Sequence, residues 1–428
     1  MTAGILALII LAAILAQVGV LLMIGLYRRK RQYRCLDTRE PDPLDSATPN
    51  DSISSSTPKP LTPDLAWCGF REFRVLRRNF DDVNHSVCSF YLVPLDGKPL
   101  PSFMPGQFLT FRLQIENPET RTSKTVVRCY SLSDRPKPDH YRISVKRLSS
   151  PTNQPEVPPG LSSNFLHTLA SENTRLMVKA PSGHFHLVED QTLPVVLIGG
   201  GIGITPMLSM LYALLESESP RSVWLFYGVR NGDEVIMGEY LQALANTHAN
   251  FHLHLCFSRP NDGDTEGVNY QHTGRVSLQL LKSTLKSTHY QFYVCGPRSM
   301  IENLVPELEK WGVALGNIHY ESFGPAMLVG RKKPDSRPVA LSAQSITVTF
   351  SKTRKRIPWD QNIDSLLELA EAQDIEVMSG CRAGSCGSCQ TPIETGEVEY
   401  SQRPDAEVEP GHCLLCISTP KSDLTLTA

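Results

Sequence analysis

The sequence predicts a multidomain chain with four parts: an N-terminal transmembrane helix, an antiparallel β-barrel, an α/β domain with a parallel sheet, and a small α+β domain. Three observations lead to this fold class. Residues 4–26 carry no charge, and near residue 192 the apolar pattern changes from short strands to alternating strands and helices. Five of the 11 cysteines lie between Cys381 and Cys416.

The composition limits the classes of protein that fit. A chain of 428 residues with 41% hydrophobic and 20% charged residues can form about three domains at roughly 150 residues each. A formal net charge of -2 gives no sign of the basic surface that nucleic-acid binding requires. The crowded cysteines indicate a metal site in a reducing compartment, because scattered cysteines elsewhere form no disulfide framework.

The apolar stretch at residues 4–26 (GILALIILAAILAQVGVLLMIGL) is long enough, as a helix, to cross a hydrocarbon core of about 30 Å. Basic residues follow it between Arg28 and Arg34. A cleaved signal peptide would carry them before a shorter stretch, and a buried core helix is the other alternative. The positive-inside rule therefore predicts a single-pass protein of the cell membrane with its body in the cytoplasm. Residues 27–64 are a basic juxtamembrane segment and then a flexible linker rich in Pro, Ser, Thr and Asp.

Residues 65–190 contain short β-branched and aromatic runs, such as QFLTFRLQI and YRISVKRL, separated by Gly, Pro and Asn. They predict the antiparallel barrel. Within it, residues 128–131 (RCYS) resemble the R-x-Y-S/T motif of the ferredoxin-NADP reductase superfamily. A guanidinium suits a phosphate, a tyrosine ring can lie against a flavin, and a hydroxyl can hydrogen-bond the flavin edge.

One such tetrapeptide can occur by chance in an ordinary barrel, so the order of further motifs matters. Residues 105–108 (PGQF) precede it, and residues 160–166 (GLSSNFL) and 181–185 (PSGHF) follow, each similar to a superfamily motif in that order. In the family the G-x-x-S turn opens a short helix whose N–H groups meet a pyrophosphate, which favours FAD over FMN.

Residues 192–323 alternate strands and helices, which predicts a parallel sheet with helices on both faces. The first strand ends in residues 199–206 (GGGIGITP), which do not match G-x-G-x-x-G. The glycines still allow a pyrophosphate to approach, Thr205 can cap the next helix, and Pro206 suits its first turn. The run is similar to the superfamily's G-x-G-x-T-P nicotinamide loop.

Two more strand ends resemble the superfamily: residues 227–230 (YGVR) and residues 295–297 (CGP), the latter followed by Ser299 and Glu302 as a predicted capping box. The resemblance puts Cys295 near the reacting nicotinamide carbon, whereas a small buried thiol packing a strand end is the alternative.

The stretch at residues 321–324 (ESFG) resembles the family's E-x-F segment. There Phe323 can stack on the flavin or be a core aromatic. Ser258 and Arg259 match the place where NADPH-using relatives hold the 2′-phosphate. This favours NADPH and leaves NADH open.

After a linker at residues 324–343, residues 344–428 contain an alternating strand, an amphipathic helix and four cysteines spaced C-x4-C-x2-C with a distant fourth. This is the plant-type ferredoxin pattern for a [2Fe-2S] cluster. The pairs Cys386-x2-Cys389 and Cys413-x2-Cys416 also fit a zinc site, but that site would leave Cys381 unused. Residues 411–424 resemble the closing segment of fused ferredoxin domains, which implies Cys416 as the fourth ligand.

Nearly all of residues 65–428 resembles reductases that join a flavin barrel, a nicotinamide domain and a C-terminal β-grasp ferredoxin domain, such as hybrid-cluster-protein reductase, phenylacetyl-CoA epoxidase reductase and oxygenase reductase components. The resemblance implies an electron-transfer oxidoreductase that carries electrons from NADPH or NADH through FAD and [2Fe-2S] to an acceptor. A membrane-bound oxygenase or desaturase is the first expectation for the acceptor. Transfer to a quinone, and a redox-sensing role, are the alternatives.

The resemblance also assigns the site residues. The implied catalytic residues are Tyr130, Ser131, Cys295, Glu321 and Phe323. The implied cofactor-binding residues are Arg128, Cys129, Tyr130, Ser131, Gly160, Leu161, Ser162, Ser163, Gly200, Gly201, Gly203, Thr205, Pro206, Arg230, Ser258, Arg259, Cys295, Gly296 and Pro297. The implied cluster ligands are Cys381, Cys386, Cys389 and Cys416.

Overall fold

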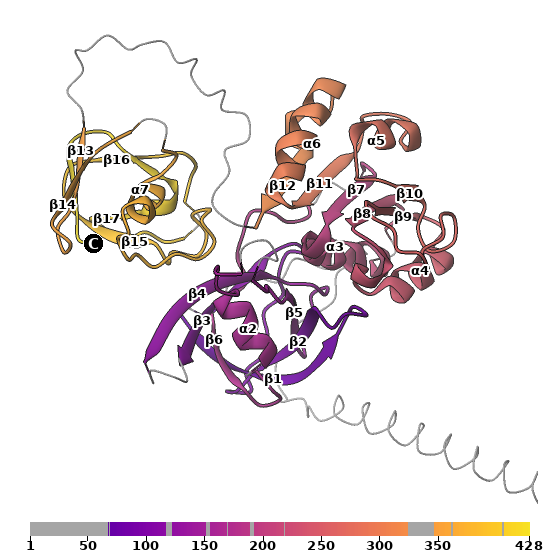
Figure 1. Ribbon diagram of the computed structural model, residues 1–428, viewed down its shortest axis with the longest axis horizontal. Coiled ribbons are helices and arrows are strands. Elements are labelled where there is room, and N and C mark those ends of the chain that lie inside the picture. Colours follow the sequence, from indigo (N-terminus) through magenta and orange to yellow (C-terminus); the bar gives the residue numbers. More distant parts are fainter. Residues whose placement is uncertain are drawn as a thin grey trace, which may run out of the picture. The chain divides into compact units, whose positions relative to one another are not determined.

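The computed structural model describes residues 67–428 apart from 68, 117–121, 151–154, 169, 189–191, 218, 324–345, 361–362 and 405. Within them lie three larger sheets and one two-stranded sheet, most of whose strands are labelled in Figure 1. Hydrophobic cores pack against the larger sheets, with one core on each face of the parallel sheet. The described residues belong to one unit by their contacts.

The first sheet has six strands, all paired antiparallel, in the order β4-β3-β6-β1-β2-β5. Its elements are β1 (Arg71–Phe80), β2 (Val87–Pro94), β3 (Phe108–Glu116), β4 (Ser123–Ser131), β5 (Tyr141–Lys146), α2 (Leu161–Thr168) and β6 (Arg175–Val178). The edge strands β4 and β5 meet at one end through the bridge between Leu132 and Ile143. The sheet is thus a half-barrel, more open than the barrel that the sequence predicted.

The second sheet has six parallel strands in the order β10-β9-β8-β7-β11-β12. Its strands are β7 (Val195–Gly200), β8 (Val223–Val229), β9 (Phe251–Phe257), β10 (His272–Thr273), β11 (Gln291–Gly296) and β12 (Ile318–Ser322). Its helices are η2 (Gly201–Gly203), α3 (Ile204–Glu216), η3 (Gly232–Glu234), α4 (Gly238–Thr247), α5 (Leu278–Thr284), α6 (Arg298–Trp311) and η4 (Leu315–Asn317).

Helices cover both faces of this sheet, as the alternating pattern predicted. Alternate residues of a strand point to opposite faces. Val195 and Leu197 therefore join the core under α3 and α4, whereas Val196 and Ile198 join the core under α5 and α6. The strand order reverses between β7 and β11, and the carboxyl ends of strands at such a switch point form a ligand crevice.

The third sheet is a mixed five-stranded sheet, in the order β14-β13-β19-β15-β17, with the pair β16-β18 beside it. Its elements are β13 (Thr347–Phe350), β14 (Lys355–Pro358), α7 (Leu366–Ala372), β15 (Gln390–Thr395), β16 (Val398–Tyr400), β17 (His412–Leu414), η5 (Leu415–Ile417), β18 (Ser418–Pro420) and β19 (Leu424–Leu426). Ser365 caps α7 by accepting from the N–H of Glu368. Leu366 and Leu369 of α7 pack on Val348 and Leu424, which gives the predicted α+β core.

The structure contradicts the predicted location, which was a single pass through the cell membrane with the body in the cytoplasm. Among the helices that the structure describes, none is both long and apolar enough to span a bilayer. The two longest, α6 with 14 residues and α3 with 13, are shorter than the ~20 apolar residues that a ~30 Å hydrocarbon core requires. The predicted span at residues 4–26 and the segment at 27–64 lie outside the described residues.

Candidate functional site

The R-C-Y-S motif occupies the end of β4. Its tyrosine, Tyr130, is paired with Leu109 across the sheet and packs edge-on against the ring of Phe111, with 5.6 Å between centroids. Burial raises the pKa of the Tyr130 hydroxyl, so that hydroxyl stays protonated. Ser131 is buried, and its Oγ has no hydrogen-bond partner among the described residues. A buried polar atom without a partner is uncommon, and a bound flavin edge would supply one.

A second unpartnered hydroxyl lies at the start of α2. Ser162 is buried, and its Oγ has no partner within the described part of the chain. The neighbouring Ser163 Oγ donates to the carbonyl of Gly160 at 3.1 Å and accepts from Leu148 N at 3.2 Å, which fixes the turn. A Cβ at Gly160 would lie 2.8 Å from the Leu148 Cβ. The turn therefore fits the glycine and two serines of the predicted pyrophosphate motif.

The P-G-Q-F motif before β4 and the P-x-G-x-F motif after it contact each other near the end of that strand. Phe108 N donates to the carbonyl of Ser182 at 2.9 Å, and Ser182 N donates back to Phe108 at 3.0 Å. A Cβ at Gly106 would lie 2.4 Å from the carbonyl oxygen of Phe185. Leu132 N donates to the carbonyl of Gln107 at 2.9 Å. The P-G-Q-F and P-x-G-x-F motifs thus meet in space at the end of β4.

The glycine loop after β7 packs against the end of β11. A Cβ at Gly203 would lie 2.2 Å from the carbonyl oxygen of Cys295 and 2.7 Å from Gly296 N. A Cβ at Gly200 would lie 2.8 Å from Pro297 Cδ. Only glycine allows backbones to approach so closely. The predicted loop and the C-G-P motif therefore form one surface at the switch point of the sheet.

Two predicted helix caps are wrong. Gly203 precedes α3 with no side-chain cap, and Thr205 lies inside the helix, where its hydroxyl donates to the carbonyl of Ile202 at 3.0 Å. Pro297 takes the N-cap position of α6, so Ser299 is already helical and forms no capping box. Glu302 instead accepts from Arg298 Nε at 2.7 Å. Both helices begin without a side-chain cap, which leaves N–H groups for a ligand.

Pairing of β11 with β12 sets Cys295 beside Glu321. Cys295 is fully buried, and this burial, together with Glu321, raises the pKa of its thiol. The Glu321 Oε2 is buried without a hydrogen-bond partner among the described residues, and burial raises the pKa of this carboxyl to about 8. Both groups are therefore uncharged at neutral pH.

Phe323 follows β12 and is 43% exposed, which excludes the alternative that it is a core aromatic. For Cys295 both sequence interpretations remain open, because the thiol is buried and also lies against Gly203 at the strand end.

The carboxyl ends of β8 and β9 lie side by side. Arg259 N donates to the carbonyl of Arg230 at 2.7 Å, and Ser258 N donates to Val229 at 3.0 Å. The Arg230 guanidinium forms an ion pair with Glu234 and donates to it from Nε at 2.7 Å. The structure thus brings the predicted residues 230, 258 and 259 together, with Arg230 already engaged by a carboxylate.

The C-x4-C-x2-C loop is shaped by left-handed residues. Arg382, Gly384 and Gly387 have φ angles of 58°, 74° and 69°. The turn that they form directs the backbone N–H groups of residues 383, 385 and 386 to the Cys381 Sγ, at 3.4, 3.3 and 3.2 Å. Such N–H···S hydrogen bonds stabilise a thiolate and tune the potential of a cluster that it binds.

The four predicted ligands lie close together in two pairs, Cys381 with Cys386 and Cys389 with Cys416. A [2Fe-2S] cluster with four cysteine ligands takes two on each iron, so this arrangement fits it. Within the described residues, no three His, Cys, Asp or Glu side chains gather closely enough to hold one metal ion. Cys413 lies in β17, fully buried, and burial raises the pKa of its thiol to about 12.

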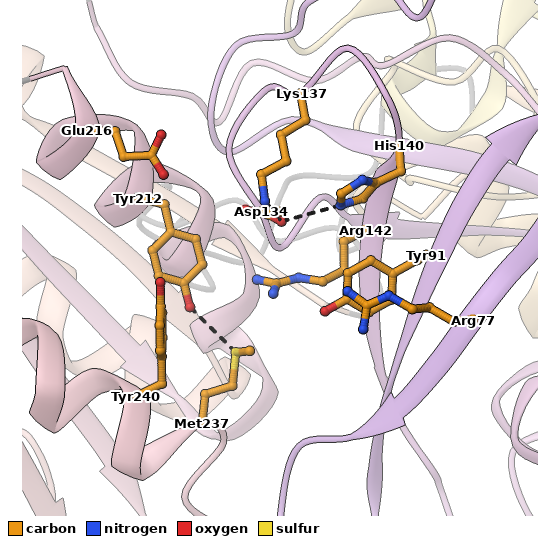
Figure 2. Close-up of a pocket in the computed structure, with 10 residues that line it drawn as sticks. All are labelled: Arg77, Tyr91, Asp134, Lys137, His140, Arg142, Tyr212, Glu216, Met237 and Tyr240. Carbon is orange, nitrogen blue, oxygen red and sulfur yellow. Dashed lines mark hydrogen bonds and ion pairs between the residues drawn. The ribbon is translucent and has the colours of Figure 1, made fainter. Parts of the chain in front are cut away.

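A polar cavity of about 230 Å³ lies between β1, β2 and β5 on one side and α3 and α4 on the other (Figure 2). It is lined by Arg77, Tyr91, Asp134, Lys137, His140, Arg142, Tyr212, Glu216, Met237 and Tyr240. Burial favours the neutral acid, yet the nearby His140, whose Nε2 lies 3.8 Å from Asp134 Oδ2, and the charges of Arg142 and Lys137 lower the pKa of Asp134.

Sequence reasoning did not select these cavity residues, although the polar run SDRPKPDH at residues 133–140 marks the loop that supplies three of them. Figure 2 shows Arg142 pointing toward Tyr212, and its guanidinium lies 5.5 Å from that ring. Lys137 donates to Asp134 at 2.8 Å. Charged groups that line the cavity interact with one another. We therefore interpret the cavity as part of the packing between the first sheet and the helices α3 and α4.

Two family profiles match the chain. The family described as "Oxidoreductase NAD-binding domain" matches residues 197–305, and the one described as "2Fe-2S iron-sulfur cluster binding domain" matches residues 348–421. These ranges fall on the parallel sheet and on the sheet that carries the cysteine loop.

Curated relatives resemble the chain over about three fifths of its length. The flavohemoprotein of Bacillus cereus (strain ATCC 10987 / NRS 248) is 41% identical over 261 residues, which are 61% of this chain and 62% of the relative. The flavohemoprotein of Bacillus anthracis is 40% identical over the same shares. The chain thus spans about three fifths of the relatives that it matches.

Two solved structures extend the comparison. The FAD/NAD-binding domain of nitric oxide dioxygenase from Vibrio cholerae O1 biovar El Tor is 30% identical, with a TM-score of 0.51, and the match covers 60% of this chain and 100% of that one. Phthalate dioxygenase reductase is 25% identical, with a TM-score of 0.50, and the match covers 84% of this chain and 98% of that one.

The chain is therefore a ferredoxin reductase-like oxidoreductase, in which a FAD- and NAD-binding unit is followed by a [2Fe-2S] domain. These comparisons confirm the predicted cofactors, which are FAD, a nicotinamide nucleotide and a [2Fe-2S] cluster.

Proposed function

We propose that this chain passes electrons from NADPH or NADH through FAD to its [2Fe-2S] cluster, and from there singly to an oxygenase-type acceptor protein. The match to phthalate dioxygenase reductase supports the order of cofactors, because it covers almost all of that protein, which is described as "a modular structure for electron transfer from pyridine nucleotides to [2Fe-2S]". The proposal assigns FAD to residues 65–190, the nucleotide to 192–323 and the cluster to 344–428.

The observation that carries the proposal is the arrangement of the four thiols. Three of them, Cys381, Cys386 and Cys389, lie on a loop whose own N–H groups point at the Cys381 sulfur, and Cys416 of η5 lies close to Cys389. The same chain carries two buried hydroxyls without partners among the described residues, Ser131 and Ser162, in the two motifs assigned to the flavin. A flavin would satisfy the hydroxyls, and two irons would satisfy the thiol pairs.

When bound, the nicotinamide supplies a hydride to the flavin, and the cluster takes up one electron at a time. The residues of the chain provide the surroundings. Gly200, Gly203 and the start of α3 receive the nucleotide phosphates, and Arg128 serves the flavin phosphate. Cys295 and Glu321, both uncharged at neutral pH, keep negative charge away from the place where the hydride moves.

Anaerobic titration of the purified protein with NADPH and with NADH tests the proposal. We expect the flavin absorbance to bleach and the EPR signal of a reduced [2Fe-2S] cluster to grow, with iron but not zinc in the metal analysis. Bleaching with no EPR signal, together with bound zinc, would contradict it.

The acceptor class needs a separate measurement. With an oxygenase component as acceptor, we expect turnover that requires the cluster, and we expect cytochrome c to replace it as an artificial one-electron acceptor. Turnover with a quinone and none with proteins would point to quinone reduction. A protein that reduces neither over many cycles would act as a redox sensor.

A further inference from the structure

The first sheet, assigned above to the flavin and called here the flavin sheet, contacts the cluster loop (residues 381–389) at Cys386. Lys179 directly follows β6, and its N–H donates to the carbonyl of Thr110 in β3 at 2.8 Å, which fixes its backbone. Its ammonium donates to the carbonyl oxygen of Cys386 at 2.7 Å and lies 5.3 Å from the ring of Phe70. The side chain is half-buried between these groups. No motif in the sequence marks Lys179.

A strand residue contacts the same ligand. Cys129 in β4 has its Sγ 3.3 Å from Thr110 Oγ1, and its thiol lies close to the thiol of Cys386. Val127 lies on the same face of β4, because alternate residues of a strand share a face. A Cβ at Gly380, just before the first cluster cysteine, would lie 3.2 Å from Val127 Cγ1. Two parts of the flavin sheet therefore contact the cluster loop: β4, and Lys179 directly after β6.

Cys129 is also the residue bonded to Tyr130 in the flavin motif. A residue of the flavin motif itself therefore lies against a predicted cluster ligand. By comparison, the ion pair between Lys124 and Glu376, at 3.6 Å, has side chains that are 64% and 87% exposed. Exposed pairs of this kind contribute little.

We propose that Lys179 and Cys129 are positioning residues that hold the cluster loop on the flavin sheet at Cys386 and make this ligand the point where an electron enters the cluster. The inference rests on the proposed function. When an electron enters the cluster, the reduced flavin loses one electron and one ferric iron of the cluster becomes ferrous. The ammonium of Lys179 stabilises the added negative charge, because a cation beside a ligand favours the reduced cluster.

The test is Lys179→Met in the full-length protein with its cofactors. A hydrogen bond to a charged group is strong enough to change an equilibrium about tenfold. We therefore expect the equilibrium constant for transfer from flavin to cluster to fall about tenfold, which for one electron is about 59 mV. EPR-monitored redox titration measures this potential, and stopped-flow absorbance measures the rate of the transfer.

The controls separate a positioning role from general damage. Lys179→Arg keeps a cation and a donor and should recover most of the potential, and Lys124→Met should leave the potential unchanged. Ferricyanide reduction by NADPH or NADH should be unchanged in Lys179→Met, since it draws electrons from the flavin. Cys129→Ala should lower the cluster potential, whereas Cys129→Ser, which keeps a donor, should lower it less.

Two outcomes overturn the inference: an unchanged potential and transfer rate in Lys179→Met, or an equal change in Lys124→Met. Failure of the proposed function would look different, because the unaltered protein would then show no cluster signal on reduction. A normal cluster signal in the unaltered protein with no effect of Lys179→Met refutes the positioning role alone.

Discussion

Replacing Glu321 with glutamine tests whether an uncharged buried carboxyl lies at the nucleotide site. The Glu321 Oε2 has no hydrogen-bond partner among the described residues, and burial raises the pKa of the group to about 8. Glutamine has nearly the same shape and stays neutral at every pH. The substitution therefore removes the ionisation of this side chain and little else.

The magnitude follows from the linkage between protonation and folding. The pKa of Glu321 in the folded protein, about 8, exceeds the ordinary value of 4.5. Above 4.5 the unfolded chain releases this proton while the folded chain keeps it, so wild-type stability is full below 4.5 and declines as the pH rises toward 8. The decline is about 1.4 kcal/mol for each pH unit. The advantage of Glu321→Gln in unfolding free energy should grow by that amount per unit.

Denaturant unfolding of both proteins at several pH values between 4.5 and 8 measures this difference. All other titrating groups are common to the two proteins, so their effects cancel. The matched control is Glu302→Gln, because Glu302 is 46% exposed and pairs with Arg298 on the surface of α6. This substitution controls for the general effect of replacing a glutamate with glutamine. Parallel loss of stability in wild type and Glu321→Gln across this range would refute the reasoning.

The same ionisation affects the reaction. Flavin reduction by NADPH or NADH should slow as the pH rises through about 8 in the wild type, because a carboxylate then appears beside the nucleotide. Glu321→Gln should lack this alkaline decline while keeping its rate at neutral pH. Stopped-flow absorbance of the flavin gives both profiles, and identical profiles would remove Glu321 from the hydride-transfer site.

Three further substitutions test other parts of the site. Gly203→Ala places a Cβ 2.2 Å from the Cys295 carbonyl, so unfolding by denaturant should show a loss of about 1–3 kcal/mol, with weaker nucleotide binding by titration; an unchanged stability would contradict the packing. Arg259→Leu should raise the KM for NADPH about tenfold and leave that for NADH nearly unchanged, because only the 2′-phosphate needs the guanidinium; equal effects on both would exclude this role. Cys416→Ser should lower the iron content and the EPR signal, whereas Cys413→Ser should keep both; the reverse result would reassign the fourth ligand.

The strands and helices around residue 200 could be predicted because local pattern and tertiary structure agree there. Val195 to Ile198 are apolar on both faces, and such a run is what a parallel strand covered by helices on both sides requires. The half-barrel was predicted less well. Whether its edge strands close depends on pairing between β4 and β5, and among the described residues this edge has one β-bridge, Leu132–Ile143, and the adjacent hydrogen bond from Ser133 N to Arg142.

Helix starts were harder to predict than helices. The sequence offered Ser299 and Glu302 at capping-box spacing, but Pro297 takes the N-cap position and Glu302 pairs with Arg298. A cap depends on which residue leaves the helical conformation, and this is set by the preceding strand. In α6 that strand is β11, whose end at Gly296 packs on Gly200.

The motifs predicted which residues meet within a site, but not which residues join two sites. The P-G-Q-F and P-x-G-x-F motifs are recognisable alone, and in the structure they contact each other through Phe108 and Ser182. Lys179 and Cys386 lie 207 residues apart, and neither a spacing nor a motif links them. Likewise Cys413 and Cys416 are equivalent in spacing, and it is the position of Cys413 inside the β15–β17 pair that separates them.

Register explains why three distant motifs act together. In the parallel sheet Cys295 is paired with Gly199 of β7 on one side and with Glu321 of β12 on the other. A slip of one residue would turn Cys295 to the opposite face and put Val294 or Gly296 beside the glutamate. The register is held because odd residues of β7 and β11 enter one core and even residues the other. The buried apolar pattern of these strands thus fixes where the thiol and the carboxyl lie, so the geometry of this pair depends on core residues as well as on the motifs.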